Sequence, residues 1–279
     1  MIPVKGYTTF HPLKHCIVGR AHDPKDVDDP LKKIMEDTNE DLDALVDKLT
    51  SAGVVCYRPN LEKKDSRPPI SPRDYLIAIG ESLFVGKVIP GYKDILSNID
   101  RNKIKWYLNN DISSGNMVRC GNHVHWDISK DVQTESEESI KKWLHENGYR
   151  VSVTRYGWHM DGVYSILKPG VIVASRDLPE LKDIYPGWDI CYVESNKKYK
   201  PIKHVWGGNH KESNYDVNIL SIDENTCFTT AENDVIFSFL RKHRIEPVVC
   251  HLRHKAFWDN GIHCMTQDLY REGVLENYF

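Results

Sequence analysis

A cysteine, a histidine and an aspartate in this chain have the types and spacing for covalent chemistry on an electron-poor carbon. Cys264 lies in the glycine-bounded segment 261–266, and His159 and Asp161 stand two residues apart, far upstream. A thiol, an imidazole and a carboxylate together form a set that nucleophilic catalysis uses. Each fragment alone has an ordinary explanation, because most cysteines are packed apolar residues and an isolated His-x-Asp is usually a surface pair.

The neighbouring residues favour a chemical role. His263 and the polar segment 259–261 flank Cys264, which predicts an exposed loop at a strand or helix end, where a thiolate is stabilised. On an extended strand, His159 and Asp161 would point to the same face. Their apolar and aromatic neighbours place this pair in or beside the core, where a charge needs a partner.

A second carboxylate stands before another apolar strand. Asp74 directly precedes the run 75–79, and an acid at this place can simply cap a turn. Asp74 and Asp161 together suit a planar cation that donates paired hydrogen bonds, above all a guanidinium. Read alone, the cysteine and histidine segments also leave a protease or an acyl transferase open.

The composition is that of an ordinary globular protein. The chain has 279 residues, a net charge of −3 and seven cysteines, none of them in a C-x-x-C pair. Nothing in this charge favours nucleic acid or an anionic membrane, so a small partner is expected. The cysteine usage, and the lack of a signal-peptide layout or an apolar span, predict the cytoplasm. No linker-like stretch divides the chain, so a single domain over 1–279 is expected.

Short strands and helices alternate around these residues. Helices are predicted over 29–53, over 136–146, with Thr134 and Glu137 as a capping box, and over 232–243. Strands are predicted over 16–19, 54–57, 75–79, 82–85, 171–174 and 217–222. The recurring strand, turn, strand, helix and strand favour a closed, propeller-like α/β array over a doubly wound sheet.

Five motifs, in the same order, resemble the amidinotransferases of the guanidino-group-modifying (pentein) superfamily, most of all the glycine amidinotransferases. The motifs are 11–20, 72–77, 117–121, 159–164 and 261–268. The resemblance runs nearly end to end. It implies a five-bladed α/β propeller with pseudo-fivefold symmetry, an active site in its central channel, and a homodimer.

The resemblance also implies a role for each central residue. Cys264 matches the nucleophile that carries the amidino group of L-arginine, and His159 matches the general acid and base. Asp161 and Asp74 match the carboxylates that hold the guanidinium nitrogens, and Met160 is counted with the substrate-binding residues. Transfer to an amine acceptor, glycine by default, would give L-ornithine and guanidinoacetate without a metal or an organic cofactor.

The chain departs from the family pattern around these residues. Ser113 stands where the family has the acid that holds the catalytic histidine, and Asp111 is the nearby replacement. Leu178 stands where the family has the arginine that binds the substrate carboxylate, and Arg176 is the nearby candidate. The segment 206–210 replaces a serine-rich stretch that contacts substrate in relatives.

Three other functions fit parts of the sequence. Water in place of the amine would make the protein an arginine deiminase or dihydrolase, which releases citrulline or ornithine with ammonia. The two departures suggest a non-catalytic binder of guanidino compounds, although the intact central residues argue against it. His123 with His125, and His251 with His254, suggest metal ligands, but without a clear third ligand satisfied surface histidines explain them better.

Overall fold

The computed structural model describes residues 1–61, 67–86, 90–106, 113–128, 135–175, 178, 180–194 and 214–279. Within these ranges the strands form five three-stranded sheets. In every sheet the central strand pairs antiparallel with one neighbour and parallel with the other. The α/β class predicted from the sequence is therefore confirmed, and so is the recurring unit.

The bounds of the strands follow the hydrogen-bonded order of each sheet. They are β15 (Thr266–Arg271), β1 (Leu13–Val18) and β2 (Val55–Tyr57); β3 (Leu76–Ile79), β4 (Ser82–Val85) and β5 (Ile104–Trp106); β6 (Met117–Cys120), β7 (His123–Asp127) and β8 (Arg150–Thr154); β9 (Tyr164–Lys168), β10 (Val171–Ser175) and β11 (Asp189–Val193); β12 (Leu220–Ser221), β13 (Thr226–Thr229) and β14 (Glu246–Val249).

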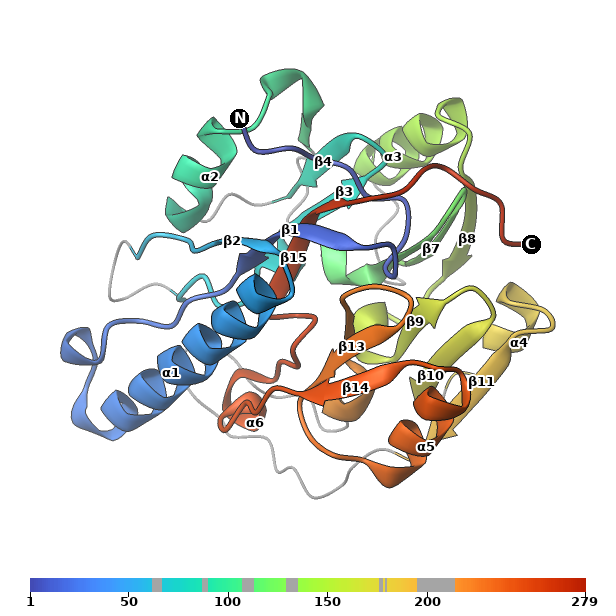
Figure 1. The fold of residues 1–279 in the computed structure, drawn as a ribbon. Helices are drawn as coiled ribbons and strands as arrows, with labels where there is room; N and C mark the ends of the chain where they lie inside the picture. The colour runs from blue at the N-terminus through green and yellow to red at the C-terminus, as the bar shows by residue number, and fades with distance from the viewer. Residues whose placement is uncertain are drawn as a thin grey trace.

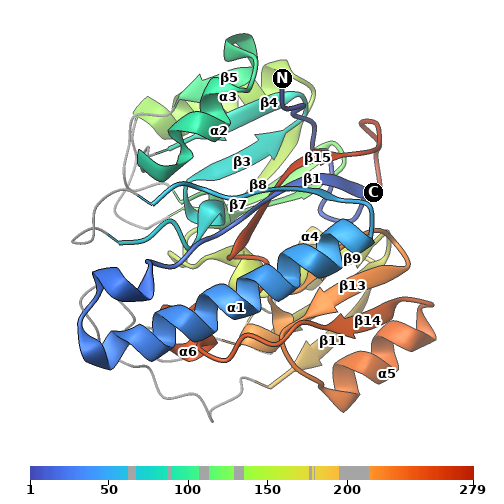
Figure 2. The same ribbon diagram turned by 60° about the vertical axis from the view of Figure 1, so that its left-hand side comes forward.

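A helix connects the central strand of each sheet to its parallel neighbour, because a parallel pair needs a crossover connection. These helices are α1 (Asp29–Ser51), α2 (Lys93–Ser97), α3 (Glu135–Glu146), α4 (Leu181–Ile184) and α5 (Asp234–Lys242). They lie toward the outside of the molecule (Figures 1 and 2). In the first unit the C-terminal strand β15 takes the antiparallel place beside β1, so the two ends of the chain complete one sheet.

Short turns precede the antiparallel strands. The 3-10 helices η2 (Pro72–Asp74), η5 (Ser114–Asn116), η6 (Met160–Gly162) and η7 (Tyr215–Val217) come before β3, β6, β9 and β12, and the turn 261–265 comes before β15. The remaining short helices are η1 (Pro24–Asp26), η3 (Pro90–Tyr92), η4 (Arg101–Lys103) and α6 (Lys255–Trp258). The same position in each unit therefore carries a turn.

The predicted elements agree with the structure except at a few places. The first predicted helix ends at Ser51, and Gly53 adopts the left-handed φ of 81° that makes glycine a helix stop. The last predicted helix begins at Asp234, because the Asn233 side chain accepts the amide of Ile236. The strand predicted over 217–222 is limited to β12, because Val217 ends η7 and residues 218–219 belong to neither a helix nor a strand. Thr134 lies outside the described residues.

Five apolar clusters form the core, and each contains residues of two neighbouring units. In the first, the buried face of α1 packs Met35, Leu42, Leu45 and Leu49 against the sheet that contains β1, as the helical spacing predicts.

All seven cysteines have free thiols. Within the described ranges, no helix is both long and apolar enough to cross a membrane.

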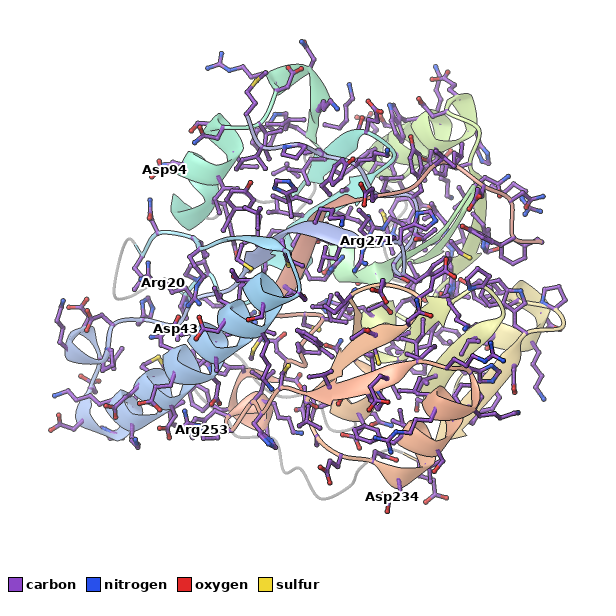
Figure 3. The ribbon with its side chains drawn as sticks, in the orientation of Figure 1. Arg20, Asp43, Asp94, Asp234, Arg253 and Arg271 are labelled. Carbon is purple, nitrogen blue, oxygen red and sulfur yellow. The ribbon has the colours of Figure 1, made fainter. Side chains whose placement is uncertain are left out.

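A buried ionic cluster joins the units near the centre. The carboxylate of Asp268, on β15, pairs with Arg73 at 2.7 Å, with Arg271 at 2.6 Å and with Arg119. Each of these four side chains is at most 2% exposed. Arg271 also donates to the backbone carbonyls of His11 and Ser221. Figure 3 shows Arg271 near the middle of the view beside β1, whereas Asp94 and Asp234 lie at the periphery.

We expect Asp268→Asn to lower the free energy of unfolding by about 3–5 kcal/mol, because removing one partner leaves buried charge unpaired. Burial alone would raise the pKa of Asp268, but Arg119, Arg73 and Arg271 outweigh it and lower that pKa well below its usual range. This stabilisation is present above the unfolded-state pKa of about 3.9 and is lost as the pH falls through the folded-state value.

Urea unfolding near neutral pH measures the loss. Asp47→Asn, at an exposed position on α1, is the matched control and is expected to change stability by less than about 0.5 kcal/mol. A loss below about 1 kcal/mol for the Asp268 variant would show that the ionic cluster does not contribute the predicted free energy of unfolding.

Candidate active site

The Cys264 thiol is buried, with 6% of the residue exposed. It lies in the turn that leads into β15, where Sγ donates to Asp161 Oδ2 at 3.2 Å and accepts from Asn218 Nδ2 at 3.1 Å. The prediction of an exposed loop is therefore wrong at this residue. The polar residues around the turn bind one another inside the core instead of facing water.

Asn218 fixes this turn and was missed from the sequence. Its Oδ1 accepts the backbone N–H groups of His263 at 2.8 Å and Cys264 at 3.1 Å. Its Nδ2 donates to the backbone carbonyl of Asp161 at 2.8 Å. A Cβ on Gly261 would lie 2.4 Å from Asn218 Oδ1, so this approach requires glycine. One polar amide within an otherwise apolar run was the signal available in the sequence.

Asp161 lies in η6 rather than on an extended strand, so the predicted strand at this pair is wrong. The carboxylate is buried, and its Oδ2 accepts a hydrogen bond from His263 Nδ1 at 2.9 Å. Burial raises the pKa of Asp161, but the bond and charge of His263, with His159 and Arg73, outweigh it and lower the pKa to about 2. Oδ1 has no hydrogen-bond partner among the described residues.

Asp74 and His159 face each other across the same site. His159, directly before η6, is half exposed, and its Nδ1 lies 3.6 Å from Asp74 Oδ1. Burial raises the pKa of Asp74, although His159 and Arg67 oppose that rise. Its Oδ1 is also buried without a hydrogen-bond partner in the described part of the chain. The site thus holds two carboxylate oxygens that are available to a donor.

Gly115 in η5 shows that His159 and Asp161 converge. A Cβ there would lie 3.2 Å from Asp161 Oδ1 and 3.3 Å from His159 Nδ1. Ser113 begins this turn, donates to the Asp74 carbonyl at 3.4 Å and accepts the amide of Gly115 at 3.3 Å. The serine therefore ties η5 to η2.

The other predicted site residues do not all reach this centre. Met160 and Leu178 are fully buried in an apolar cluster with Phe10, and a role for Met160 in substrate binding stays a prediction. Asp111 and Arg176 lie outside the described residues, as does the segment 206–210.

Three of the four histidines in the two pairs have ordinary partners, and His123 and His125 are buried, so the prediction of surface histidines is wrong for these two. His123 bonds to Ser152 at 2.8 Å, His125 bonds to Tyr164 at 2.8 Å and to Thr154, and His254 bonds to Asp37 at 3.0 Å. Among the described residues no three histidine, cysteine or acidic side chains are grouped to hold a metal ion.

The surroundings of Cys264 disfavour the thiolate. Burial raises the pKa of Cys264 well above its usual value, and the charges of Asp161 and Asp74 raise it further. A cation bound beside these carboxylates would compensate their charge and favour the thiolate. The site is therefore arranged to pair a nucleophilic sulfur with a positively charged ligand.

Comparison with known proteins connects this geometry to a family. No family model matches the chain. The chain is 25% identical over 160 residues to L-arginine:L-lysine amidinotransferase of Pseudomonas savastanoi pv. phaseolicola, covering 54% of this chain and 43% of that protein. It is 22% identical over 303 residues to inosamine-phosphate amidinotransferase 1 of Streptomyces glaucescens, covering 88% and 84%. The chain is an amidinotransferase homologue.

Solved structures share the fold. A saxitoxin-pathway amidinotransferase from Microseira wollei superposes with a TM-score of 0.79 at 18% identity, with 100% of each chain covered. A dimethylarginine dimethylaminohydrolase gives a TM-score of 0.68 at 14% identity, covering 91% of this chain and 99% of that one. The fold of the amidinotransferase homologue is thus shared by proteins named as transferases and as a hydrolase.

We expect Asp74→Asn to make the Cys264 thiol more reactive in the absence of substrate, because it removes a charge that raises the pKa of Cys264. A lower pKa increases the thiolate fraction near pH 8, and we expect alkylation by iodoacetamide to be about tenfold faster. Mass spectrometry of the peptide that contains Cys264 measures the rate. Asp189→Asn, at an exposed position on β11, is the control, and equal rates in all three proteins would contradict the charge argument.

Proposed function

We propose that the protein transfers the amidino group of L-arginine to an amine through a covalent intermediate on Cys264. The observation that supports this most directly is the pair of buried carboxylate oxygens, Asp74 Oδ1 and Asp161 Oδ1, that lack hydrogen-bond partners among the described residues. A guanidinium offers several N–H donors in one plane, and it is cationic. It satisfies both oxygens and compensates the charge beside the sulfur.

The first half of the reaction forms the intermediate. The thiol proton passes to solvent as the guanidinium binds, and Sγ of Cys264 attacks the guanidinium carbon to form a C–S bond. The bond between that carbon and Nε of arginine, the nitrogen attached to Cδ, breaks. His159 protonates this nitrogen, so L-ornithine leaves as an amine and the amidino group stays on sulfur.

The second half reverses these steps with a different amine. The acceptor amine attacks the amidino carbon, gives a proton to His159, and the C–S bond breaks to restore the cysteine. Asp74 and Asp161 hold the cationic amidino group in both halves. His159 fits the proton transfers because it is half exposed at the mouth of the site, where the two amines exchange.

The acceptor is a small primary amine, with glycine proposed first, which would make the second product guanidinoacetate. The similar proteins are named for lysine, inosamine phosphate and glycine, so a panel of amines is the appropriate test. We also propose that the five sheets close into one pseudo-fivefold propeller domain over 1–279, which their shared strand order supports. A homodimer and a cytoplasmic location stay predictions from the sequence.

Hydrolysis is the second candidate, because the fold is shared with a dimethylaminohydrolase and His159 is open to solvent. In that reaction Sγ attacks the guanidinium carbon and the bond to a terminal nitrogen breaks, so ammonia leaves first and water then releases citrulline from the sulfur. Hydrolysis of citrulline would give ornithine, a second ammonia and carbon dioxide. The two functions differ in whether product formation requires an acceptor amine.

We expect L-ornithine to exceed one equivalent per protein only when an acceptor amine is present, because arginine alone allows a single half-reaction. Chromatography of products with and without glycine, lysine or an aminocyclitol phosphate measures this. With arginine alone, intact mass should show an adduct of about 42 Da on the protein. Cys264→Ala should lose both adduct and turnover, whereas Cys250→Ala should keep both, and citrulline without acceptor would establish hydrolysis instead.

A further inference from the structure

We propose that Asp127, at the end of β7, positions His159 by holding the backbone of the three residues that precede it. The inference rests on the proposed acid and base role of His159. It names a residue that orients His159, because Ser113 replaces the acid that has this role in the family. Asp127 does not touch the site, so it is a positioning residue.

The carboxylate of Asp127 accepts four hydrogen bonds from one short segment. Oδ1 accepts the Thr154 hydroxyl at 2.7 Å and the Tyr156 amide at 2.8 Å. Oδ2 accepts the amides of Gly157 at 2.6 Å and Trp158 at 2.7 Å. The side chain is completely buried, and a buried carboxylate is tolerable only when its oxygens are bonded in this way.

The segment needs such a fixed point. Gly157 has a φ of 80°, a left-handed conformation that glycine adopts readily, and Trp158 is partly exposed. The chain therefore turns sharply at the surface directly before His159. Three consecutive amides that converge on one carboxylate define the direction in which the next residue leaves the turn.

Asp127 also holds η5, the turn that lies against the His159 ring. Its backbone carbonyl accepts from Asn116 Nδ2 at 2.9 Å, and Asn116 ends η5, next to Gly115. Gly115 lies against the His159 ring. One residue thus fixes both the backbone that carries the ring and the turn on which the ring packs.

A buried hydrogen-bond chain extends behind the carboxylate. Thr154 Oγ1 lies 3.0 Å from His125 Nε2, His125 Nδ1 lies 2.8 Å from the Tyr164 hydroxyl, and that hydroxyl lies 3.0 Å from Tyr185. Burial lowers the pKa of His125 to about 4, so its ring is neutral near pH 7.

The direction of this chain follows from the carboxylate, which only accepts. Thr154 must donate to Asp127, so its oxygen accepts from His125 Nε2–H. The neutral ring then accepts at Nδ1 from Tyr164, and Tyr164 accepts from Tyr185. The structure therefore assigns the Nε2–H tautomer to His125.

The His159 ring needs this backbone support. Among the described residues, Asp74 is the charged side chain that faces the ring. The distance from His159 Nδ1 to Asp74 Oδ1 is 3.6 Å, which is longer than a hydrogen bond. Ser113, at the family's acidic position, bonds to the Asp74 carbonyl and to Gly115 instead. Orientation is thus supplied through the main chain.

The main test is Asp127→Asn, which keeps the shape but replaces one accepting oxygen with a donor. We expect kcat for amidino transfer to fall about 10- to 100-fold, with KM for arginine changed by less than about twofold. The NMR signals of the His159 ring should shift or broaden. Tyr185→Phe is the matched control, because it removes a hydroxyl at the far end of the same chain, and it should leave kcat and the His159 signals near those of wild type.

Two measurements on the wild-type protein keep the proposal testable if Asp127→Asn does not fold or if transfer is not the activity. The Trp158 amide, on a partly exposed residue, should exchange with deuterium as slowly as amides inside a strand. Nitrogen shifts should identify His125 as the Nε2–H tautomer.

Fast exchange at Trp158, the opposite tautomer, or equal losses of kcat in Asp127→Asn and Tyr185→Phe would each overturn the proposal. Absence of transfer by the wild-type protein, with slow exchange and the Nε2–H tautomer retained, would instead reject the proposed function and keep the positioning role.

Discussion

The carboxylate of Asp268 is the interaction on which the centre of this protein depends. Three guanidinium groups from different parts of the chain are buried around it, and burial of such charges is tolerable only with a close counter-charge. Arg73 precedes β3, Arg119 lies on β6, and Arg271 shares β15 with the aspartate. Arg119 also reaches the carbonyl of Ala78. The cluster therefore sets how the first three sheets approach, and Cys264 stands only four residues from Asp268.

The site follows from this arrangement because each unit contributes the same element to it. Asp74 ends η2, Gly115 lies in η5, His159 and Asp161 flank and enter η6, and Asn218 follows η7. The thiol comes from the turn before β15, in the corresponding place. A turn before an antiparallel strand leaves polar groups free at one end of its sheet. Five such ends meet, so residues far apart in sequence form one compact set of donors and acceptors.

The sequence was most informative where residue type alone fixes the chemistry. Cys264, His159, Asp161 and Asp74 were predicted because a nucleophile, a proton carrier and two acids have few substitutes. Burial of the thiol and the 3-10 turn at η6 were not predicted, because they depend on how the turns pack together. Asn218 and Asp127 were missed for a related reason. An amide or a carboxylate after an apolar run can cap, pair or stay solvated, and only the folded backbone shows which groups it binds.

Two carboxylates beside a thiol are unfavourable for a nucleophile, since both raise the pKa of that thiol. This effect of the two carboxylates on the thiol becomes useful when the ligand is a cation. Without a bound cation, both charges favour the protonated thiol, whose Sγ donates to Asp161 Oδ2. When a guanidinium enters, its charge compensates both acids and its carbon is brought to the sulfur. The carboxylates that restrain the thiol are thus the ones that select the ligand, and activation is coupled to binding. In the proposed reaction His159 can remain partly exposed, because its role is to exchange protons with the two amines.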